Sequence, residues 1–281
     1  MIVFEKAAEL NQFLASERKK GKSVGFVPTM GALHNGHISL INKAKEGNDL
    51  AVASVFVNPT QFNNADDLKK YPRTIDADKA LLEKHGCDVL FFPSVDEIYP
   101  EKDNTLFDLG GLDTLMEGKF RPGHFNGVAM VVKRLFEIVQ PDNAYFGEKD
   151  FQQLAIIRYM VKAEKLPVNV IGCPTLRESS GLAMSSRNMR LTEEEKTEAA
   201  AIYKALLAAK ENAKILAPEK VKEIFENTIN QNPVFRFEYF EIVDSETLLP
   251  VNERNPQRKA VGCVAIWIRD VRLIDNLLIF P

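Results

Sequence analysis

The sequence has little of what marks several large classes of protein. Its three cysteines, among 281 residues, are an odd number without a C-x-x-C pair, which disfavours a disulfide framework and a zinc site and indicates a cytoplasmic protein. No run approaches about eighteen consecutive apolar residues, so we expect no membrane span. The N-terminal segment carries charges too early and too often for a secretory signal, and we expect none.

Clustered basic charge is also scarce. The net charge is −3, and the longest basic block is Arg-Lys-Lys at 18–20. Binding of nucleic acid needs a basic face, so we expect no nucleic-acid partner. A tRNA synthetase fragment is disfavoured for the same reason, since no basic anticodon-binding segment is present. An anionic ligand must therefore be met by cations that are placed individually.

Apolar segments with strand character alternate with amphipathic segments over the first part of the chain. The pattern predicts strands at 23–28, 50–57, 88–92, 143–146 and 168–172, and helices at 5–20, 36–47, 74–86, 125–140 and 150–165. This alternation predicts an α/β fold in which helices cover both faces of a parallel sheet. Ligands of such sheets bind beyond the carboxyl ends of the strands, where 28–37, 58–61 and 147–153 would lie.

The pattern changes after about residue 175. A helix is predicted at 192–213, where Thr192 and Glu195 form a capping box, and another is predicted after Pro218. Strands that no helix separates are predicted at 235–244, 260–269 and 271–280. This order of elements predicts a smaller α+β domain with an antiparallel sheet.

Two of the four histidines, His34 and His37, flank Gly36 directly after a predicted strand. A helix that begins near Asn35 would hold both imidazoles at its N-terminus, where backbone N–H groups and the helix dipole favour an anion. One turn apart, the two rings can face the same ligand, and Gly36 leaves room for a ribose or a phosphate. A helix start that merely tolerates imidazoles is one alternative. A metal pair is another, although H-E-x-x-H sites need a glutamate and histidines four apart.

The segment "FGEKDFQQ" at 146–153 carries a second group of polar residues. Gly147 permits a tight turn after a strand, and Lys149 is a point cation suited to phosphate. Asp150 could cap the next helix, contact a ribose, or hold a magnesium ion through water. Gln153 lies one turn further and could face the same cleft, or simply the solvent.

A loop rich in serine and glycine, 173–188, joins the two expected domains, 1–175 and 176–281. Its segment 184–188, "MSSRN", carries two hydroxyls and the cation Arg187. Alone this pattern is common. Opposite the histidine pair, such a loop can act as a lid that brings a cation to a polyphosphate.

Five segments in chain order resemble the pantoate–β-alanine ligase family of the nucleotidyltransferase superfamily. They are "PTMGALHNGH", "SVFVNPTQF", "RPGHFNGV", "FGEKDFQQ" and "GLAMSSRN", and the likeness covers most of residues 24–192. The resemblance implies a Rossmann-like N-terminal domain and a smaller C-terminal lid domain. It also implies a cytoplasmic homodimer that condenses (R)-pantoate with β-alanine. ATP would be split to AMP and pyrophosphate, with Mg²⁺, through a pantoyl-adenylate.

The same resemblance implies roles for single residues. ATP would be lined by Met30, Gly31, Ala32, Leu33, His34, Asn35, Gly36, His37, Gly147, Glu148, Lys149, Asp150, Leu176, Met184, Ser185, Ser186 and Arg187. The catalytic groups would be His37, His34, Lys149 and Arg187. Gln61 and Gln153 would bind pantoate, with Gln61 also near β-alanine, and Asp150 could reach the metal through water.

Three residues depart from the family's usual pattern. Ser180 stands where aspartate is usual, Met130 where threonine is usual, and Arg190 where an aromatic residue is common. These departures bear on lid dynamics and affinity rather than on the reaction class.

The proposed chemistry needs alignment and charge neutralisation rather than a protein nucleophile, because a carboxylate that attacks the α-phosphate meets like charge. The cysteines lie outside the five segments, which disfavours a thioester route. Two other functions stay open. A related adenylyltransferase would need a basic acceptor pocket, whereas Gln61 and Gln153 are neutral amides. A non-catalytic nucleotide-binding protein would bind ATP without releasing pyrophosphate.

Overall fold

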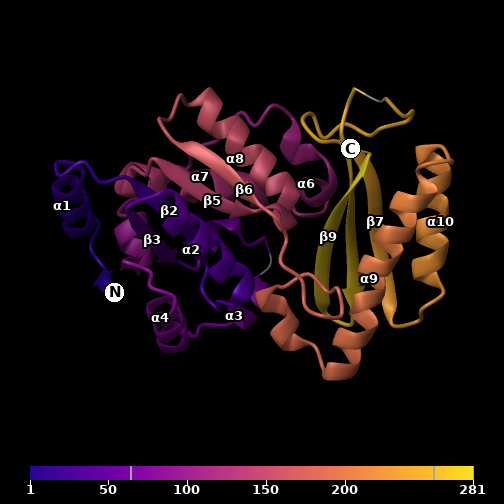
Figure 1. Cartoon of the computed structure of the whole chain (residues 1–281), viewed down its shortest axis with the longest axis horizontal. Coiled ribbons are helices and arrows are strands. Elements are labelled where there is room, and N and C mark those ends of the chain that lie inside the picture. Colours follow the sequence, from indigo (N-terminus) through magenta and orange to yellow (C-terminus); the bar gives the residue numbers. More distant parts are fainter. Residues whose placement is uncertain (64, 256, 281) are drawn as a thin grey trace. The chain divides into compact units, whose positions relative to one another are not determined.

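The computed structural model describes residues 1–63, 65–255 and 257–280. Contacts along the chain divide it into two compact units (Figure 1). The first unit comprises Met1–Glu148 and Gln153–Pro174, and the second comprises Lys149–Gln152 and Thr175–Pro281. Among the described residues, no helix is both long enough and apolar enough to cross a membrane.

A six-stranded parallel sheet forms the centre of the first unit, in the order β1-β4-β3-β2-β5-β6. The strands are β1 (Ile2–Phe4), β2 (Val24–Thr29), β3 (Leu50–Val55), β4 (Val89–Phe91), β5 (Asn143–Gly147) and β6 (Asn169–Cys173). The chain places β3 and β4 on one side of β2 and then returns to place β5 and β6 on the other. This reversal between β2 and β5 is a topological switch point, the place where ligands of open α/β sheets usually bind.

Helices cover both faces of this sheet. The long ones are α1 (Ala7–Arg18), α2 (Asn35–Gly47), α4 (Ile75–Lys84), α7 (His124–Val139) and α8 (Phe151–Ala163). Phe26 of β2 packs edge-on against Phe136 of α7, with ring centroids 6.4 Å apart. The next residue, Val27, belongs to a core cluster with Ile41 of α2. Because successive side chains of a strand point to opposite faces, α2 and α7 lie on opposite sides of the sheet.

Several short elements were not predicted from the sequence. They are β1, three α-helices and four 3₁₀ helices: α3 (Ala65–Lys70), α5 (Val95–Ile98), α6 (Met116–Phe120), η1 (Pro59–Gln61), η2 (Leu112–Thr114), η3 (Glu148–Asp150) and η4 (Ser186–Arg190). Each has three to six residues, which is too few for a periodic pattern to show.

The second unit packs two helices on a three-stranded antiparallel sheet of order β7-β8-β9 (Figure 1). Its elements are α9 (Glu193–Asn212), α10 (Pro218–Asn230), β7 (Phe235–Asp244), β8 (Ala260–Ile268) and β9 (Val271–Phe280). The Thr192 hydroxyl accepts the Glu195 N–H, and the Glu195 carboxylate accepts the Thr192 N–H, so the predicted capping box is present. Phe225 of α10 stacks on Phe240 of β7 in the core. The predicted fold class, a parallel α/β sheet with a smaller α+β part, is confirmed.

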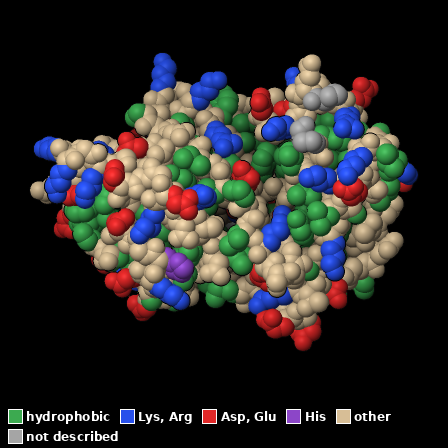
Figure 2. Space-filling view, in the orientation of Figure 1, with side chains coloured by type: hydrophobic (Ala, Val, Ile, Leu, Met, Phe, Trp, Pro, Cys, Tyr) green, Lys and Arg blue, Asp and Glu red, His purple; other side chains and the backbone are tan. Residues whose placement is uncertain are grey.

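The charged side chains are mixed in sign on the face that Figure 2 shows. Lysines and arginines there stand among aspartates and glutamates rather than gathering in one basic area. This distribution agrees with a net charge of −3 over the chain.

Candidate active site

The histidine pair lies at the N-terminus of α2, directly after the loop that follows β2. His34 is the N-cap residue, and its Nδ1 accepts the Gly36 N–H at 3.1 Å. His37 Nδ1 accepts the His34 N–H at 3.3 Å, and the two ring centroids are 4.1 Å apart. A ring nitrogen that accepts such a bond carries no proton, so each neutral ring holds its proton on Nε2. The imidazoles therefore cap the helix, and the same bonds orient two Nε2–H donors away from the backbone.

The loop before the helix is held in a left-handed turn by a buried carboxylate. Gly31 and Ala32 have φ of +82° and +50°, and a Cβ at Gly31 would lie 3.0 Å from both Asp78 and Val55. Asp78 of α4 is 2% exposed. Its two oxygens accept the N–H groups of Ala32 at 3.0 Å and Leu33 at 2.8 Å. Asp78 thus fixes the backbone that leads to the histidine pair.

Gln61 reaches the same loop from the end of β3. It is 7% exposed and lies in η1, and its Nε2 is 2.9 Å from the sulfur of Met30. The fully buried Asn58 donates to Gln61 Oε1 at 3.2 Å and to the Gly127 carbonyl at 3.0 Å. The Tyr99 hydroxyl in turn donates to Asn58 Oδ1 at 3.0 Å. Asn58 therefore sets the orientation of the Gln61 amide, with the amide nitrogen toward Met30.

The segment "RPGHFNGV" positions the backbone of Gln61. His124 Nδ1 donates to the Gln61 carbonyl at 2.8 Å, and His124 Nε2 accepts from Arg121 at 3.0 Å. The assignment of donor and acceptor follows because a carbonyl oxygen can only accept. Helix α7 also comes very close here: a Cβ on Gly127 would lie 2.4 Å from the Thr60 carbonyl oxygen.

The segment after β5 is divided between the two units. Gly147 ends the strand with an ordinary φ, and a Cβ there would meet no atom within 4 Å, so the turn itself does not require glycine. Lys149, in η3, belongs to the second unit, and its Nζ lies 3.9 Å from an oxygen of Asp150. The Asp150 side chain is 47% exposed. Gln153 is half-buried on α8 and belongs to the first unit.

Several other predicted residues meet within the second unit. Lys149, Ser185 and Arg187 line one small cavity together with Arg272 and Asp275. Its volume is about 10 Å³, room for about one water molecule.

Hydrogen bonds of the Ser185 hydroxyl and of the backbone order the 184–188 loop. Ser185 caps η4 by accepting the Arg187 N–H at 3.3 Å. The Met184 N–H donates to the Leu176 carbonyl at 3.0 Å, and Ser186 is buried.

The three departures from the family pattern have defined surroundings. Ser180 Oγ accepts the Leu182 N–H at 3.4 Å, as a short carboxylate could. Met130 is buried in α7. Arg190 forms an ion pair of 2.7 Å with Asp270.

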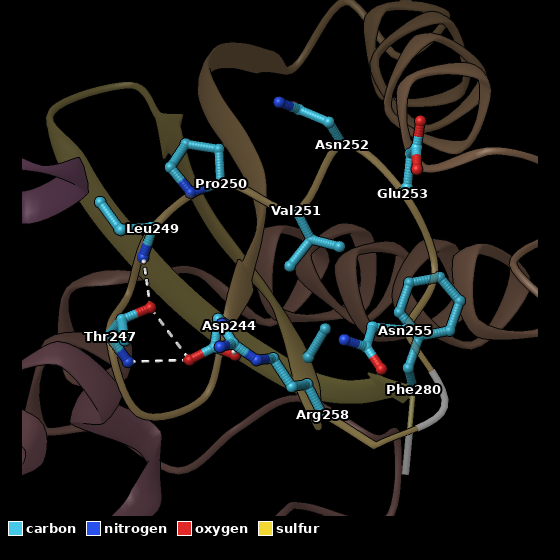
Figure 3. A pocket seen from close by; sticks show the side chains of 11 residues that line it. Asp244, Thr247, Leu249, Pro250, Val251, Asn252, Glu253, Asn255, Arg258 and Phe280 are labelled. Carbon is cyan, nitrogen blue, oxygen red and sulfur yellow. Dashed lines mark hydrogen bonds and ion pairs between the residues drawn. The ribbon is translucent and has the colours of Figure 1, made fainter.

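A second hollow in the second unit, of about 300 Å³, contains none of the predicted site residues (Figure 3). Its polar wall includes Asp244 and Arg258. The Asp244 carboxylate is engaged in the adjacent turn, where it accepts the N–H and hydroxyl of Thr247 at 2.9 and 3.0 Å.

The cysteines are all buried. Burial raises the pKa of Cys87 to about 11 and also raises the pKa of Cys173, so neither forms a thiolate readily near neutral pH. A metal site at the histidine pair would need further ligands. No group of three or more His, Cys, Asp or Glu placed to hold a metal occurs in the part of the chain that the structure describes.

Four residues that hold the site in place were not predicted from the sequence: Asp78, Asn58, Tyr99 and His124. Asp78 had a detectable signal, because it shares the apolar stripe of its helix with Ile75 and Leu82. An aspartate at a core-facing position needs partners, and here they are backbone N–H groups.

The parallel sheet, its switch point and the polar groups beside it define an α/β protein with a candidate ligand site at the carboxyl edge of β2 and β3. A family model described as pantoate-beta-alanine ligase matches residues 2–278. The chain belongs to this family, which confirms the resemblance and makes the chain an enzyme.

The chain is similar to relatives and solved structures along its whole length. A pantothenate synthetase of Porphyromonas gingivalis is 51% identical over 277 residues, which is 99% of both chains. One from Bacteroides fragilis is 50% identical over 99% of this chain and 98% of its own. The crystal structure of pantothenate synthetase from Thermus thermophilus matches with a TM-score of 0.93 and 46% identity over 100% of both chains. The pantoate-beta-alanine ligase of Francisella tularensis, in complex with beta-gamma ATP and β-alanine, matches with a TM-score of 0.82 and 38% identity over 99% and 97%.

Proposed function

We propose that this ligase condenses (R)-pantoate with β-alanine and splits ATP to AMP and pyrophosphate through a pantoyl-adenylate. The observation that carries the proposal is the start of α2, where two imidazoles with Nε2–H donors lie 4.1 Å apart, centroid to centroid, at the positive end of a helix dipole. Such a site favours a polyphosphate. The Francisella tularensis relative, a complex with beta-gamma ATP and β-alanine, supports the same substrates here.

In the first step, a carboxylate oxygen of pantoate would form a bond to the α-phosphorus, and the bond from that phosphorus to the leaving pyrophosphate would break. His34 and His37 would donate hydrogen bonds to the phosphates, and Lys149 and Arg187 would neutralise them. Mg²⁺, when bound, would neutralise phosphate charge further. The exposed Asp150 carboxylate beside Lys149 suits the combination of carboxylate and phosphate oxygens that Mg²⁺ prefers.

In the second step, the amine of β-alanine would attack the acyl carbon, so that a C–N bond forms and AMP leaves with the electrons of the C–O bond. AMP is a good leaving group, and the protein needs mainly to align the amine and to keep water away. We propose the 184–188 loop as the segment that shields the anhydride. The expected domains 1–175 and 176–281 would then serve as the substrate-binding part and the lid.

The remaining parts of the proposal concern the assembly and its place in the cell. We propose a cytoplasmic homodimer, as the family resemblance implies. Light scattering behind a sizing column would give the mass directly: a dimer of the 31.6 kDa chain is expected, and a monomer would contradict it.

Pyrophosphate exchange tests the reaction. With Mg-ATP, labelled pyrophosphate and pantoate but no β-alanine, the enzyme should move label into ATP, because adenylate formation is reversible and needs no amine. Omission of pantoate should abolish the exchange. Exchange that requires a phosphate ester would instead favour the adenylyltransferase, and absence of exchange with every acceptor would leave a nucleotide-binding protein.

Gln61→Ala should raise the KM for pantoate by about 5- to 150-fold, equivalent to about 1–3 kcal/mol for a substrate group left unpaired. The reason is that Asn58 occupies Gln61 Oε1 and one N–H of the amide nitrogen points to the Met30 sulfur, so the second N–H would donate toward the substrate. Gln61→Glu keeps the acceptor for Asn58 but adds negative charge, and should impair pantoate binding at least as much.

The control for Gln61 is the affinity for ATP. Calorimetry without pantoate should give the same Kd for ATP in the wild type and in both variants. A loss of ATP affinity equal to the loss for pantoate would show that Gln61 contacts the nucleotide instead.

A further inference from the structure

Strand β9 contacts the segment that contains Lys149, one of the cations proposed to bind phosphate. The Asn276 side-chain amide donates to the carbonyl oxygen of Lys149 at 2.8 Å. Lys149 lies in the single turn of η3, between the end of β5 at Gly147 and the start of α8 at Phe151. A turn this short contains little internal hydrogen bonding, so a bond from outside has a large share in fixing its peptide planes.

The neighbouring residue of β9, Asp275, holds Arg177 near the start of the 173–188 loop. Asp275 is 6% exposed, and its two oxygens accept from both terminal nitrogens of Arg177, at 2.6 and 2.8 Å. The Arg177 guanidinium also stacks on Tyr203 of α9, 3.8 Å from the ring centroid, and donates to the Gly181 carbonyl at 3.1 Å. A bidentate, stacked and largely buried pair is a rigid anchor. Asp275 therefore fixes β9 to the base of this loop.

Asn276 thus stands on a strand that is itself anchored. Its backbone carbonyl accepts from Arg177 at 3.2 Å, and its backbone N–H donates to Asp275 Oδ1 at 2.7 Å. Asn276, whose side chain holds the Lys149 carbonyl, is therefore hydrogen-bonded to both members of the Arg177–Asp275 ion pair. The same ion pair anchors the loop that bears Arg187. Two of the cations that line the small cavity described above, Lys149 and Arg187, thus lie on segments that are anchored by two adjacent residues of β9.

We propose that Asn276 is a positioning residue for the adenylation step. By holding the Lys149 carbonyl, it fixes the peptide from which the Lys149 ammonium reaches the phosphates. The inference rests on the proposed function, in which Lys149 neutralises phosphate charge. In this proposal Asn276 does not contact the substrate and acts only through Lys149.

The test is a double-mutant cycle between Asn276 and Lys149. Asn276→Ala should weaken ATP binding and slow pyrophosphate exchange by about three- to tenfold, the usual effect of one lost hydrogen bond. Asn276→Asp has the same shape but no N–H to donate, and should do at least as much. In a Lys149→Ala background, Asn276→Ala should change the Kd for ATP no further, because the group that it positions is gone. Calorimetry gives this Kd even where turnover is too slow to measure.

Asn232→Ala is the matched control. Asn232 lies in the same unit and makes comparable side-chain bonds, to Glu198 and to the Val234 N–H, at a place without site residues. It should leave ATP affinity and exchange unchanged.

The outcomes separate this inference from the proposed function. Exchange by the unmodified enzyme tests the function itself. If the wild type exchanges and Lys149→Ala is impaired, but Asn276→Ala is silent, the positioning role is wrong. It is equally wrong if Asn276→Ala weakens ATP binding by the same factor in the Lys149→Ala background. It is also wrong if Asn276→Ala lowers both ATP affinity and the melting temperature while Asn276→Asp lowers neither.

Discussion

His37→Asn should slow pantoyl-adenylate formation by about 10²–10³-fold, the loss of rate expected when one oriented transition-state donor is removed. The N-terminal cap of α2 should be kept. The asparagine Oδ1 lies close to where the ring holds Nδ1, so it can still accept the His34 N–H, as Nδ1 does at 3.3 Å. No atom of asparagine reaches the position of Nε2. The variant therefore removes the proposed donor and retains the capping acceptor.

His37→Gln makes the opposite exchange. Its amide nitrogen comes near the position of Nε2, whereas no acceptor remains near Nδ1, so it should recover part of the rate and lose some helix stability. The measurements are pyrophosphate exchange and the melting temperature. His85→Asn, at the C-cap of α4, is the control imidazole and should change neither.

The same two variants, His37→Asn and His37→Gln, can also refute a catalytic role of His37. Near-normal exchange by His37→Asn, together with a lowered melting temperature of His37→Gln, would mean that His37 only caps the helix. The histidines would then be the helix start that the sequence alone left open as an alternative.

Elements with enough residues to show a period were predictable. Strands such as β2 and β3 are apolar runs, and the capping residues Thr192 and Glu195 mark the start of α9. Strand β1 could not be predicted in this way. It has three residues, and it exists as a strand because it pairs with β4, which lies far along the chain. Pairing of this kind leaves no local signature.

The same division applies to the candidate site. Residues that lie together in the sequence, such as His34 and His37, were recognisable from composition and spacing. The groups that hold the backbone of the site were not. Asp78, which holds the loop before the histidine pair, and His124, which holds Gln61, come from helices that are distant in sequence. The roles proposed for the recognised residues stay predictions that the variants above test.

Asp78→Ala should have the largest effect on the fold of the site. The carboxylate is 2% exposed and accepts the N–H groups of Ala32 and Leu33, two hydrogen bonds that the alanine variant would lose. At about 1–3 kcal/mol for each of these two lost bonds, the free energy of unfolding should fall by roughly 2–6 kcal/mol. The left-handed turn at Ala32 would lose what holds it, so affinity for ATP should fall as well.

Asp78→Asn separates the lost bonds from the lost side-chain volume. Its single oxygen can still accept one N–H, while its amide nitrogen would face the other, so stability and ATP affinity should fall between those of the wild type and Asp78→Ala. Urea denaturation gives the first quantity and calorimetry the second. Asp76→Ala, an exposed aspartate in the first turn of the same helix, should stay within about 0.5 kcal/mol of the wild type. If Asp78→Ala were as mild as Asp76→Ala, the turn would hold itself, and the two backbone bonds would not explain how the loop before the histidine pair is fixed.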